Sequence, residues 1–152
     1  MNILFLCTGN ISRSYLAEML LKHEISRNRS DGIFVASAGI LDNQGIPADP
    51  AMMDYLAKLN IPAGDHLSRT ITKEDLEWAD LIFVMEKRHR EYLQNHWPEI
   101  NDKVELLSKY ISPDQFDDDI VDPYCKSPYH YRLAQSQITL AIKSLFKKLA
   151  RK

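Results

Sequence analysis

The sequence predicts an α/β fold with an open, twisted, four-stranded parallel sheet and helices on both faces. Short apolar runs alternate along the chain with segments whose apolar residues have helical spacing, the order typical of strand-helix-strand units. One of these runs, residues 80–85, is almost entirely apolar, as in strands that are buried on both faces. The chain has 152 residues, of which 45% are hydrophobic and 26% charged, so we expect one domain over residues 1–152.

The first strand-helix-strand unit opens the chain. Residues 2–7 form an apolar run, which ends at the turn-forming residues 8–10. Residues 32–38 form the second predicted strand, which a right-handed connection should place parallel to the first. The helix between the two strands is predicted from apolar side chains on one helical face: Leu16, Ala17, Leu20, Leu21 and Ile25.

Two helices are predicted before the third strand. Asp49 is a good N-cap for a helix over residues 50–59, which has a proline at its first position. Thr72 and Asp75 have the spacing of a capping box and predict a short helix that ends at Trp78. The apolar run at residues 80–85 follows directly and is the third strand.

The last third of the chain contains the fourth strand and a long helix. We expect a helix over residues 88–96 and a short strand over residues 104–107. The irregular stretch at residues 111–123 is long for a compact domain, and such loops are more often functional than idle. Ser127 and Pro128 cap the final helix, whose apolar face comprises Tyr131, Ala134, Ile138, Ala141, Ile142, Leu145 and Leu149.

Composition argues against several classes of protein. Lys and Arg total 19 against 21 Asp and Glu, and the longest run of like charges is acidic (Asp117, Asp118, Asp119), so no nucleic-acid partner is expected. No apolar run approaches the length of a membrane span, so we expect no membrane insertion. The two cysteines, Cys7 and Cys125, are too few for a disulfide scaffold or a zinc site, and a reducing cytoplasm is the expected location.

The segment between the first strand and the first helix has the features of an anion site. Backbone N–H groups converge where a parallel strand leads into a helix, and the helix N-terminus is electropositive. Cys7 would lie below a bound phosphate, Arg13 would hold two of its oxygens, and Ser14 can donate to the thiolate. Such surroundings stabilise a thiolate and make it a nucleophile. The expected phosphate-binding residues are Thr8, Gly9, Asn10, Ile11, Ser12, Arg13 and Ser14.

Phosphoryl transfer to a cysteine also needs a proton donor for the leaving oxygen. Asp122 is the candidate, because Pro123 favours an extended backbone there and Tyr124 offers an aromatic wall. The residues alone leave alternatives open. Cys7 could simply end a buried strand beside a surface arginine, the Asp-Pro pair could be an ordinary turn, and a carboxyl of the preceding acidic run could be the acid.

Taken together, these segments resemble the low-molecular-weight protein tyrosine phosphatases from residue 2 to about residue 149. The first loop resembles the Cys-x5-Arg-Ser signature of that family, and Asp122 falls at the position of its general acid. Further resemblance lies in residues 37–39 with Gly45 and Pro47, and in residues 66–69 and 72–75. The resemblance implies that Cys7 is the nucleophile, Arg13 the phosphate clamp and Asp122 the general acid and base. It also implies that the loop is supported by Asn10, Ser14, Ser37 and His66.

The chain departs from the family pattern at three places. Ser12 stands where many members carry a second cysteine, so a protective disulfide with Cys7 is not expected unless Cys125 supplies it. Tyr15 replaces the proline that usually follows Arg-Ser. A bulky aromatic on the pocket wall is also missing, which leaves an expected substrate wall of Ile11, Leu41, Asp42 and Tyr124.

The sequence therefore predicts a hydrolase that removes phosphate from phosphotyrosine through a cysteinyl-phosphate, without a cofactor or metal. Its expected partners are a phosphotyrosine-containing protein and, as a candidate, a cognate tyrosine kinase. Protein-arginine phosphatases are one alternative, but they carry threonine where Ile11 stands. Thiol-dependent arsenate reductases need further cysteines, which residues 82–89 do not provide. A phosphate- or phosphoprotein-binding module without catalysis would need neither Cys7 nor Asp122.

Overall fold

The computed structural model describes residues 1–112 and 118–151. Of the acidic run that the sequence offers as alternative proton donors, Asp117 lies outside the described residues. Short 3-10 turns, η1 and η2, flank the last strand. In chain order the elements are β1 (Asn2–Cys7), α1 (Arg13–Arg27), β2 (Phe34–Gly39), α2 (Pro50–Lys58), α3 (Lys73–Trp78), β3 (Leu81–Val84), α4 (Lys87–His96), η1 (Pro98–Lys103), β4 (Val104–Leu106), η2 (Leu107–Tyr110) and α5 (Pro128–Ala150).

The four strands form one parallel sheet in the order β2-β1-β3-β4. The prediction of an α/β fold with a four-stranded parallel sheet is confirmed. Strand β1 is central, and the chain passes to β2 on one side of it and to β3 on the other. In open parallel sheets such a reversal leaves a crevice at the carboxyl ends of the strands, where ligands bind. The loop after β1 and the loop after β3 both begin at this crevice.

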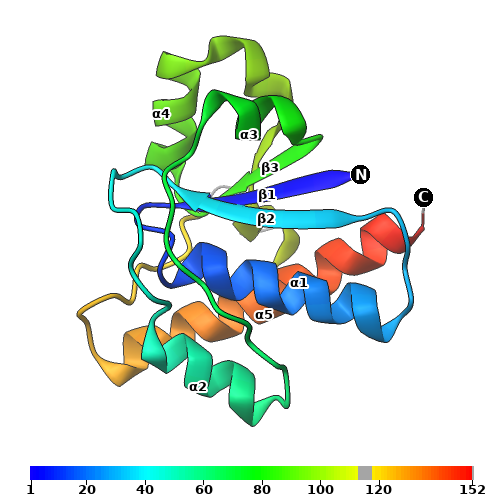
Figure 1. Ribbon diagram of the computed structural model, residues 1–152, viewed down its shortest axis with the longest axis vertical. Coiled ribbons are helices and arrows are strands. Elements are labelled where there is room, and N and C mark those ends of the chain that lie inside the picture. The colour runs from blue at the N-terminus through cyan, green and yellow to red at the C-terminus, as the bar shows by residue number, and fades with distance from the viewer. Residues whose placement is uncertain (113–117, 152) are drawn as a thin grey trace.

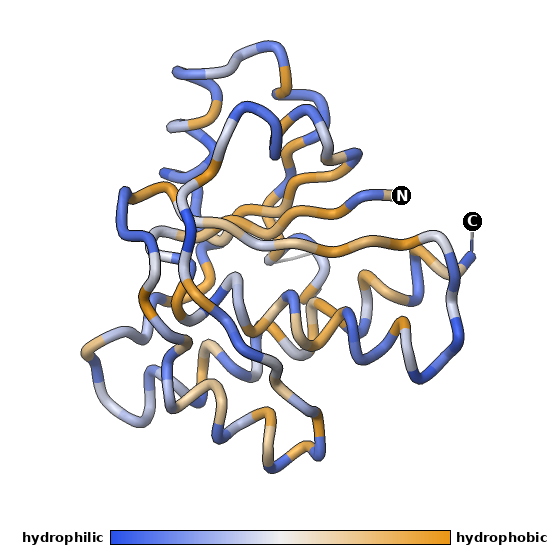
Figure 2. Tube along the Cα trace, in the orientation of Figure 1, coloured by the Kyte–Doolittle hydropathy of each residue, from blue (hydrophilic) through white to orange (hydrophobic). Residues whose placement is uncertain are grey.

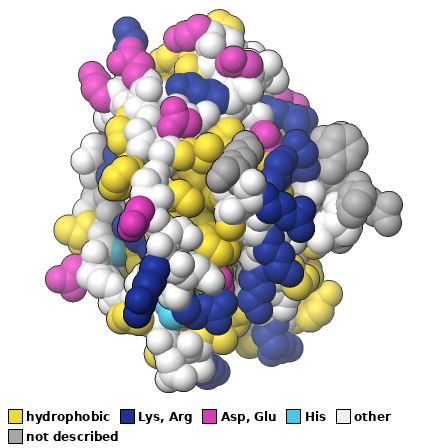
Figure 3. All heavy atoms as spheres, turned by 90° about the vertical axis from the view of Figure 1, so that its right-hand side faces the viewer, with side chains coloured by type: hydrophobic (Ala, Val, Ile, Leu, Met, Phe, Trp, Pro, Cys, Tyr) yellow, Lys and Arg dark blue, Asp and Glu magenta, His cyan; other side chains and the backbone are white. Residues whose placement is uncertain are grey.

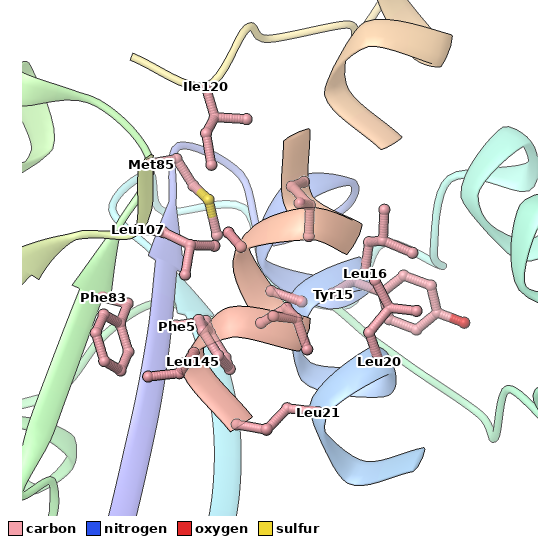
Figure 4. Close-up of a cluster of buried hydrophobic side chains, with 14 of the residues drawn as sticks. Phe5, Tyr15, Leu16, Leu20, Leu21, Phe83, Met85, Leu107, Ile120 and Leu145 are labelled. Carbon is pink, nitrogen blue, oxygen red and sulfur yellow. The ribbon is translucent and has the colours of Figure 1, made fainter. Parts of the chain in front are cut away.

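Helices cover both faces of the sheet (Figure 1). Alternate residues of β1 face opposite sides: Ile3 and Phe5 belong to one buried cluster, and Leu4 and Leu6 belong to the other. The first cluster packs under α1, α2 and α5, and its central side chains are drawn in Figure 4. The second packs under α3 and α4. The hydrophobic colour of the strands in Figure 2 reflects this burial on both faces.

Most of the predicted helix starts are found in the structure. The Asp49 carboxylate accepts the backbone N–H of Ala51 at 3.0 Å and caps α2. Thr72 and Asp75 form the reciprocal capping box of α3. Ser127 is the exception: it occupies the N-cap position of α5, but its hydroxyl bonds to His130 Nδ1 at 2.7 Å and does not cap the backbone. The prediction of a serine cap was therefore wrong in its chemistry, because the histidine one turn later takes the hydroxyl.

Gly39, at the end of β2, lets two backbone segments touch. A Cβ atom at this position would lie 2.9 Å from the backbone carbon of Gly9 and 3.0 Å from the backbone nitrogen of Asn10. Real Cβ atoms are not found so close to backbone atoms, so a glycine is required here. The end of β2 therefore packs directly against the backbone of the loop that follows β1.

Candidate active site

Cys7 ends β1 and is almost completely buried, with 3% of its surface exposed. Its Sγ lies 3.2 Å from the backbone nitrogen of Asn10, which donates to it, and 2.9 Å from Ser14 Oγ. A thiolate can only accept hydrogen bonds, so in that state of Cys7 the Ser14 hydroxyl donates to the sulfur. Two donors therefore stabilise a negative charge on the sulfur.

The loop between Cys7 and α1 is held in shape by Asn10. This residue has a φ of 58°, in the left-handed region, and is fully buried. Its side-chain nitrogen donates to Ser14 Oγ and to Ser37 Oγ, both at 2.9 Å. Its backbone carbonyl oxygen lies 2.8 Å from His66 Nε2. The structure thus brings together the four residues expected to support the loop, from β2, α1 and the segment before α3.

Tyr15 occupies the position where the family pattern has proline, and α1 nevertheless begins at Arg13 without disturbance. The Tyr15 ring is fully buried and lies 4.7 Å from the His66 ring, centroid to centroid. Burial, with a smaller effect of the Glu18 charge, raises the pKa of Tyr15. The tyrosine therefore acts as packing behind the loop and supports the histidine that bonds to Asn10.

Arg13 is the first residue of α1 and its side chain is 2% exposed. One guanidinium nitrogen donates to the carbonyl oxygen of Ile120 at 2.8 Å. The other lies 2.8 Å from the Glu86 carboxylate and 3.7 Å from the Asp122 carboxylate. A buried arginine needs such partners, because an unpaired buried charge is costly. Arg13 lines the same pocket as Cys7.

A pocket of about 120 Å³ joins these groups. Cys7, Arg13 and Asp122 all line it, so three residues that are far apart in the sequence meet at one site. Thr8, Gly9, Ile11 and Ser12 line it as well, whereas Asn10 and Ser14 are buried behind the loop. The Asp122 side chain is 38% exposed and lies at the mouth, where its carboxylate also accepts the backbone N–H of Tyr124.

The wall of the pocket differs at one position from the expected set. Ile11, Leu41 and Tyr124 line the pocket, but Asp42 does not, and Asn43 takes its place. The reason is a tight turn in which the Asn43 backbone N–H donates to the Leu41 carbonyl oxygen at 3.0 Å. Asp42 points instead toward the Thr70 hydroxyl, and the side chain of Asn43 lies against Gly9.

The two other acidic residues of the long loop that the structure describes, Asp118 and Asp119, make their hydrogen bonds elsewhere. The Asp119 carboxylate accepts the backbone N–H of Lys87 at 2.8 Å and so satisfies the first turn of α4. Asp118 accepts the Ser108 hydroxyl through its backbone oxygen. Neither of them lines the pocket. Of the described acidic residues in this loop, Asp122 is the one at the site.

The two cysteines lie in different surroundings. Cys7 is buried in the pocket, whereas Cys125 is exposed and does not line the pocket. Both are free thiols in the structure. Ser12, at the position of the second family cysteine, donates its hydroxyl hydrogen bond to the Asp49 carboxylate at 2.6 Å. The serine thus ties the loop to the start of α2.

The start of α4 supplies three site residues that were not expected from the sequence: Glu86, Arg88 and His89. Burial tends to raise the pKa of Glu86, but hydrogen bonding from Arg88 and the charge of Arg13 outweigh it and lower the pKa to about 2. Burial and the charge of Arg13 lower the pKa of His89 to about 4. One signal could have identified them: they follow β3, which neighbours β1 in a parallel sheet.

The opposite end of the molecule, where the strands begin, has a different character. Figure 3 faces this end and shows Lys and Arg side chains gathered along one side, beside exposed hydrophobic ones. One hollow near the C-terminal end of α5 is lined by Lys109, Lys147, Lys148 and Arg151. The expected absence of a nucleic-acid partner stays a prediction.

Within the described residues, no helix has the length and apolar character needed to cross a membrane.

Comparison with known proteins identifies the family. The family model described as low molecular weight phosphotyrosine protein phosphatase matches residues 2–152. The chain belongs to this family. The family assignment made from the Cys-x5-Arg-Ser loop is thereby confirmed. The relatives of this chain include members named protein-arginine-phosphatases and members named protein-tyrosine-phosphatases.

Individual members of the phosphatase family are similar over nearly the whole chain. A protein-arginine-phosphatase of Bacillus subtilis is 31% identical over 98% of this chain and 97% of its own. The low molecular weight protein-tyrosine-phosphatase Etp of Escherichia coli is 32% identical over 99% and 95%. The structure of Vibrio vulnificus Wzb in complex with benzylphosphonate superposes with a TM-score of 0.85, at 33% identity and 97% coverage of both chains.

Proposed function

We propose that this protein is a cysteine-dependent phosphatase that hydrolyses phosphotyrosine in proteins. One observation carries the proposal: Cys7, Arg13 and Asp122 line a single small pocket. A nucleophile, a phosphate clamp and a proton donor are the three groups that transfer of a phosphoryl group to a cysteine requires. We propose the loop residues 8–14 as the phosphate site and Asn10, Ser14, Ser37 and His66 as its support.

In the first step the Cys7 thiolate attacks phosphorus in line with the leaving oxygen. The S–P bond forms as the P–O bond to the substrate breaks, and Asp122 donates its proton to the departing phenolic oxygen. The loop N–H groups and Arg13 stabilise the charge on the three equatorial oxygens of the transition state, which is the largest expected contribution to the rate.

In the second step water hydrolyses the cysteinyl-phosphate. Asp122, now ionised, takes a proton from the attacking water as the new P–O bond forms, and the S–P bond breaks. The products are inorganic phosphate and the Cys7 thiolate, which hydrogen bonds from Asn10 N–H and Ser14 stabilise. Protons and electrons balance over the cycle without a redox partner or metal.

The pocket wall favours an aromatic substrate. Ile11, Leu41 and Tyr124 offer apolar surface around the entrance, where the ring of a phosphotyrosine would lie. Benzylphosphonate, the ligand named for the Wzb structure, has the same combination of ring and phosphoryl group. Two relatives are named protein-arginine-phosphatases, so phosphoarginine is the competing substrate.

The proposal also covers the cellular setting. A phosphotyrosine-containing protein requires a tyrosine kinase to produce it, so a cognate kinase is the proposed functional partner. Two free thiols, one of them proposed as the nucleophile, fit a reducing compartment, and we propose a cytoplasmic location. We propose that residues 1–152 form one phosphatase domain.

Substrate class is tested with two peptides of one sequence, phosphorylated either on tyrosine or on arginine. We expect a higher kcat/KM for the phosphotyrosine peptide, unchanged by EDTA, and no turnover by Cys7→Ser. Cys125→Ser is the matched control, since Cys125 is exposed and lies outside the pocket. Preference for the phosphoarginine peptide would reverse the substrate assignment, and turnover by Cys7→Ser would end the cysteine mechanism.

The role of Asp122 as the acid is tested by the dependence of kcat/KM, which reports the first step alone, on the pKa of the leaving group. Asp122→Asn should slow poor leaving groups by ~10²–10⁴, and activated aryl phosphates much less. Asp118→Asn is the control, because Asp118 is exposed, lies outside the pocket and bonds to Ser108 through its backbone oxygen, which the substitution keeps. If wild type and Asp122→Asn show the same dependence, Asp122 is not the acid.

A further inference from the structure

Thr8, the residue after Cys7, connects the loop to the first turn of α4. Its Oγ1 lies 3.0 Å from His89 Nε2 and 2.8 Å from a guanidinium nitrogen of Arg88. Thr8 also lines the pocket that contains Cys7, Arg13 and Asp122. The Thr8 hydroxyl therefore contacts two side chains of another element, and the residue that carries it lines the pocket.

The protonation state of His89 follows from the hydrogen bond that its other ring nitrogen, Nδ1, accepts. Nδ1 lies 3.1 Å from the backbone nitrogen of Glu86, and a backbone N–H can only donate. Nδ1 is therefore the acceptor and carries no proton, which leaves the ring proton on Nε2. The ring is 2% exposed, and its lowered pKa keeps it neutral near pH 7. His89 Nε2 consequently donates to Thr8 Oγ1.

Arg88 is the second donor to Thr8, since a guanidinium has no acceptor. Its orientation is fixed by the Glu86 carboxylate, which it contacts at 3.0 Å through Nε and at 3.2 Å through the nitrogen that also reaches Thr8. A hydroxyl oxygen accepts two hydrogen bonds and donates one. Both acceptor positions of Thr8 Oγ1 are thus filled, and only its proton remains to be placed.

Because Thr8 lines the pocket, a phosphoryl group bound there would bring acceptor oxygens close to this residue. Among the described residues, Thr8 Oγ1 makes no hydrogen bond to a carbonyl or carboxylate oxygen. We propose that the Thr8 hydroxyl donates its proton to a phosphoryl oxygen of the substrate, and that His89 and Arg88 are positioning residues that orient it. This inference rests on the proposed phosphatase function and adds a side-chain donor to the loop.

Two donors to one hydroxyl also make it a stronger donor. A hydroxyl that accepts hydrogen bonds is polarised, and the bond from Arg88 is assisted by charge. Glu86, the N-cap residue of α4, pairs with Arg13. The start of α4 therefore orients two groups of the phosphate site, the Arg13 guanidinium and the Thr8 hydroxyl.

Thr8→Val tests the proposal, because valine keeps the shape of threonine and removes the hydroxyl. The probes are binding of inorganic phosphate, measured by calorimetry, and kcat/KM for an aryl phosphate. Loss of a hydrogen bond to a charged oxygen should weaken both by roughly 10- to 100-fold. Thr8→Ser, which restores the hydroxyl, should recover most of the loss. If Thr8→Val fails to fold, Thr8→Ala provides the same comparison.

A double-mutant cycle tests the positioning role. His89→Asn can still accept the Glu86 N–H but is too short to reach Thr8, so it should weaken phosphate binding several-fold in the wild type. In a Thr8→Val background it should have no further effect on binding. Equal losses in both backgrounds would mean that His89 affects binding independently of Thr8 and would overturn the positioning role.

The outcomes separate this inference from the function on which it rests. Thr8→Val that binds phosphate and turns over substrate like the wild type would overturn the inference and leave the phosphatase function intact. Wild-type protein that binds phosphate but hydrolyses no phosphomonoester would overturn the function, and the binding comparison would still decide whether the Thr8 hydroxyl contacts the anion.

Discussion

Arg13 donates to the backbone carbonyl oxygen of Ile120 at 2.8 Å, and this bond joins the phosphate loop to the segment that carries the proposed acid. Ile120 is fully buried near Met85 and Leu107, as Figure 4 shows, and its backbone N–H donates to the Met85 carbonyl oxygen at 2.9 Å. Asp122 follows two residues later. The core thus holds Arg13, the proposed clamp, against the buried segment that leads to Asp122, the proposed acid, and we expect this contact to reduce the ordering that substrate binding requires.

Glu86→Gln should destabilise the protein and reduce activity together. The native pKa of Glu86 is about 2, below its ordinary value of 4.5, so the ionised carboxylate stabilises the fold. The contribution is complete above pH 4.5 and is lost as the pH falls through the native pKa. A shift of this size corresponds to about 3 kcal/mol. Because Arg13 loses its charged partner, we also expect kcat/KM to fall by roughly 10²-fold.

The measurement for Glu86 is urea unfolding between pH 2 and pH 7, together with the aryl phosphatase assay. Wild type should lose stability below pH 4.5 more steeply than Glu86→Gln. Glu91→Gln is the matched control, because Glu91 lies exposed on the same helix. Parallel stability curves for wild type and Glu86→Gln would show that the buried pair does not stabilise the native state.

His89 gives a second pH dependence, in a different window. Its native pKa is about 4, against an ordinary value of 6.5. Between these pH values the unfolded chain therefore binds a proton at His89 and the native state does not. Stability is therefore complete above pH 6.5 and falls as the pH drops toward 4, by about 3 kcal/mol in total. His89→Asn should flatten the curve between these values. His96→Asn, at an exposed site, is the control, and an unchanged slope in His89→Asn would contradict the buried neutral ring.

Gly39→Ala should damage the phosphate loop from outside the pocket. The added Cβ would meet the Gly9 and Asn10 backbone at 2.9 and 3.0 Å, and backbone atoms cannot yield as a side chain can. We expect a loss of stability of about 1–3 kcal/mol and a fall in kcat/KM of roughly 10²-fold. Gly64→Ala is the control, since a Cβ atom added there would meet nothing within 4 Å. Equal activity of the two variants would refute the packing argument.

The parts of the fold and of the site that depend on residues close in the sequence could be predicted, whereas the parts that depend on contacts between distant segments could not. The strands and the capping box at Thr72 follow from neighbouring residues, and the order of strands and helices implied the parallel sheet. The roles of Glu86 and His89 arise only when β3 lies beside β1, because their partners are Arg13 and Thr8. The exchange of Asp42 for Asn43 on the pocket wall depends on one turn, which a single sequence does not specify.

The proposed mechanism requires a phosphoryl group bound to the Cys7 sulfur, and this intermediate can be trapped. Asp122→Asn should still be phosphorylated by p-nitrophenyl phosphate, whose leaving group needs no acid, but should lack the base for hydrolysis. We predict a burst of p-nitrophenol of one equivalent per site, and a phosphoryl group on the Cys7 peptide by rapid-quench mass spectrometry. A burst-free time course, or a phosphoryl group on any residue other than Cys7, would overturn the cysteinyl-phosphate mechanism.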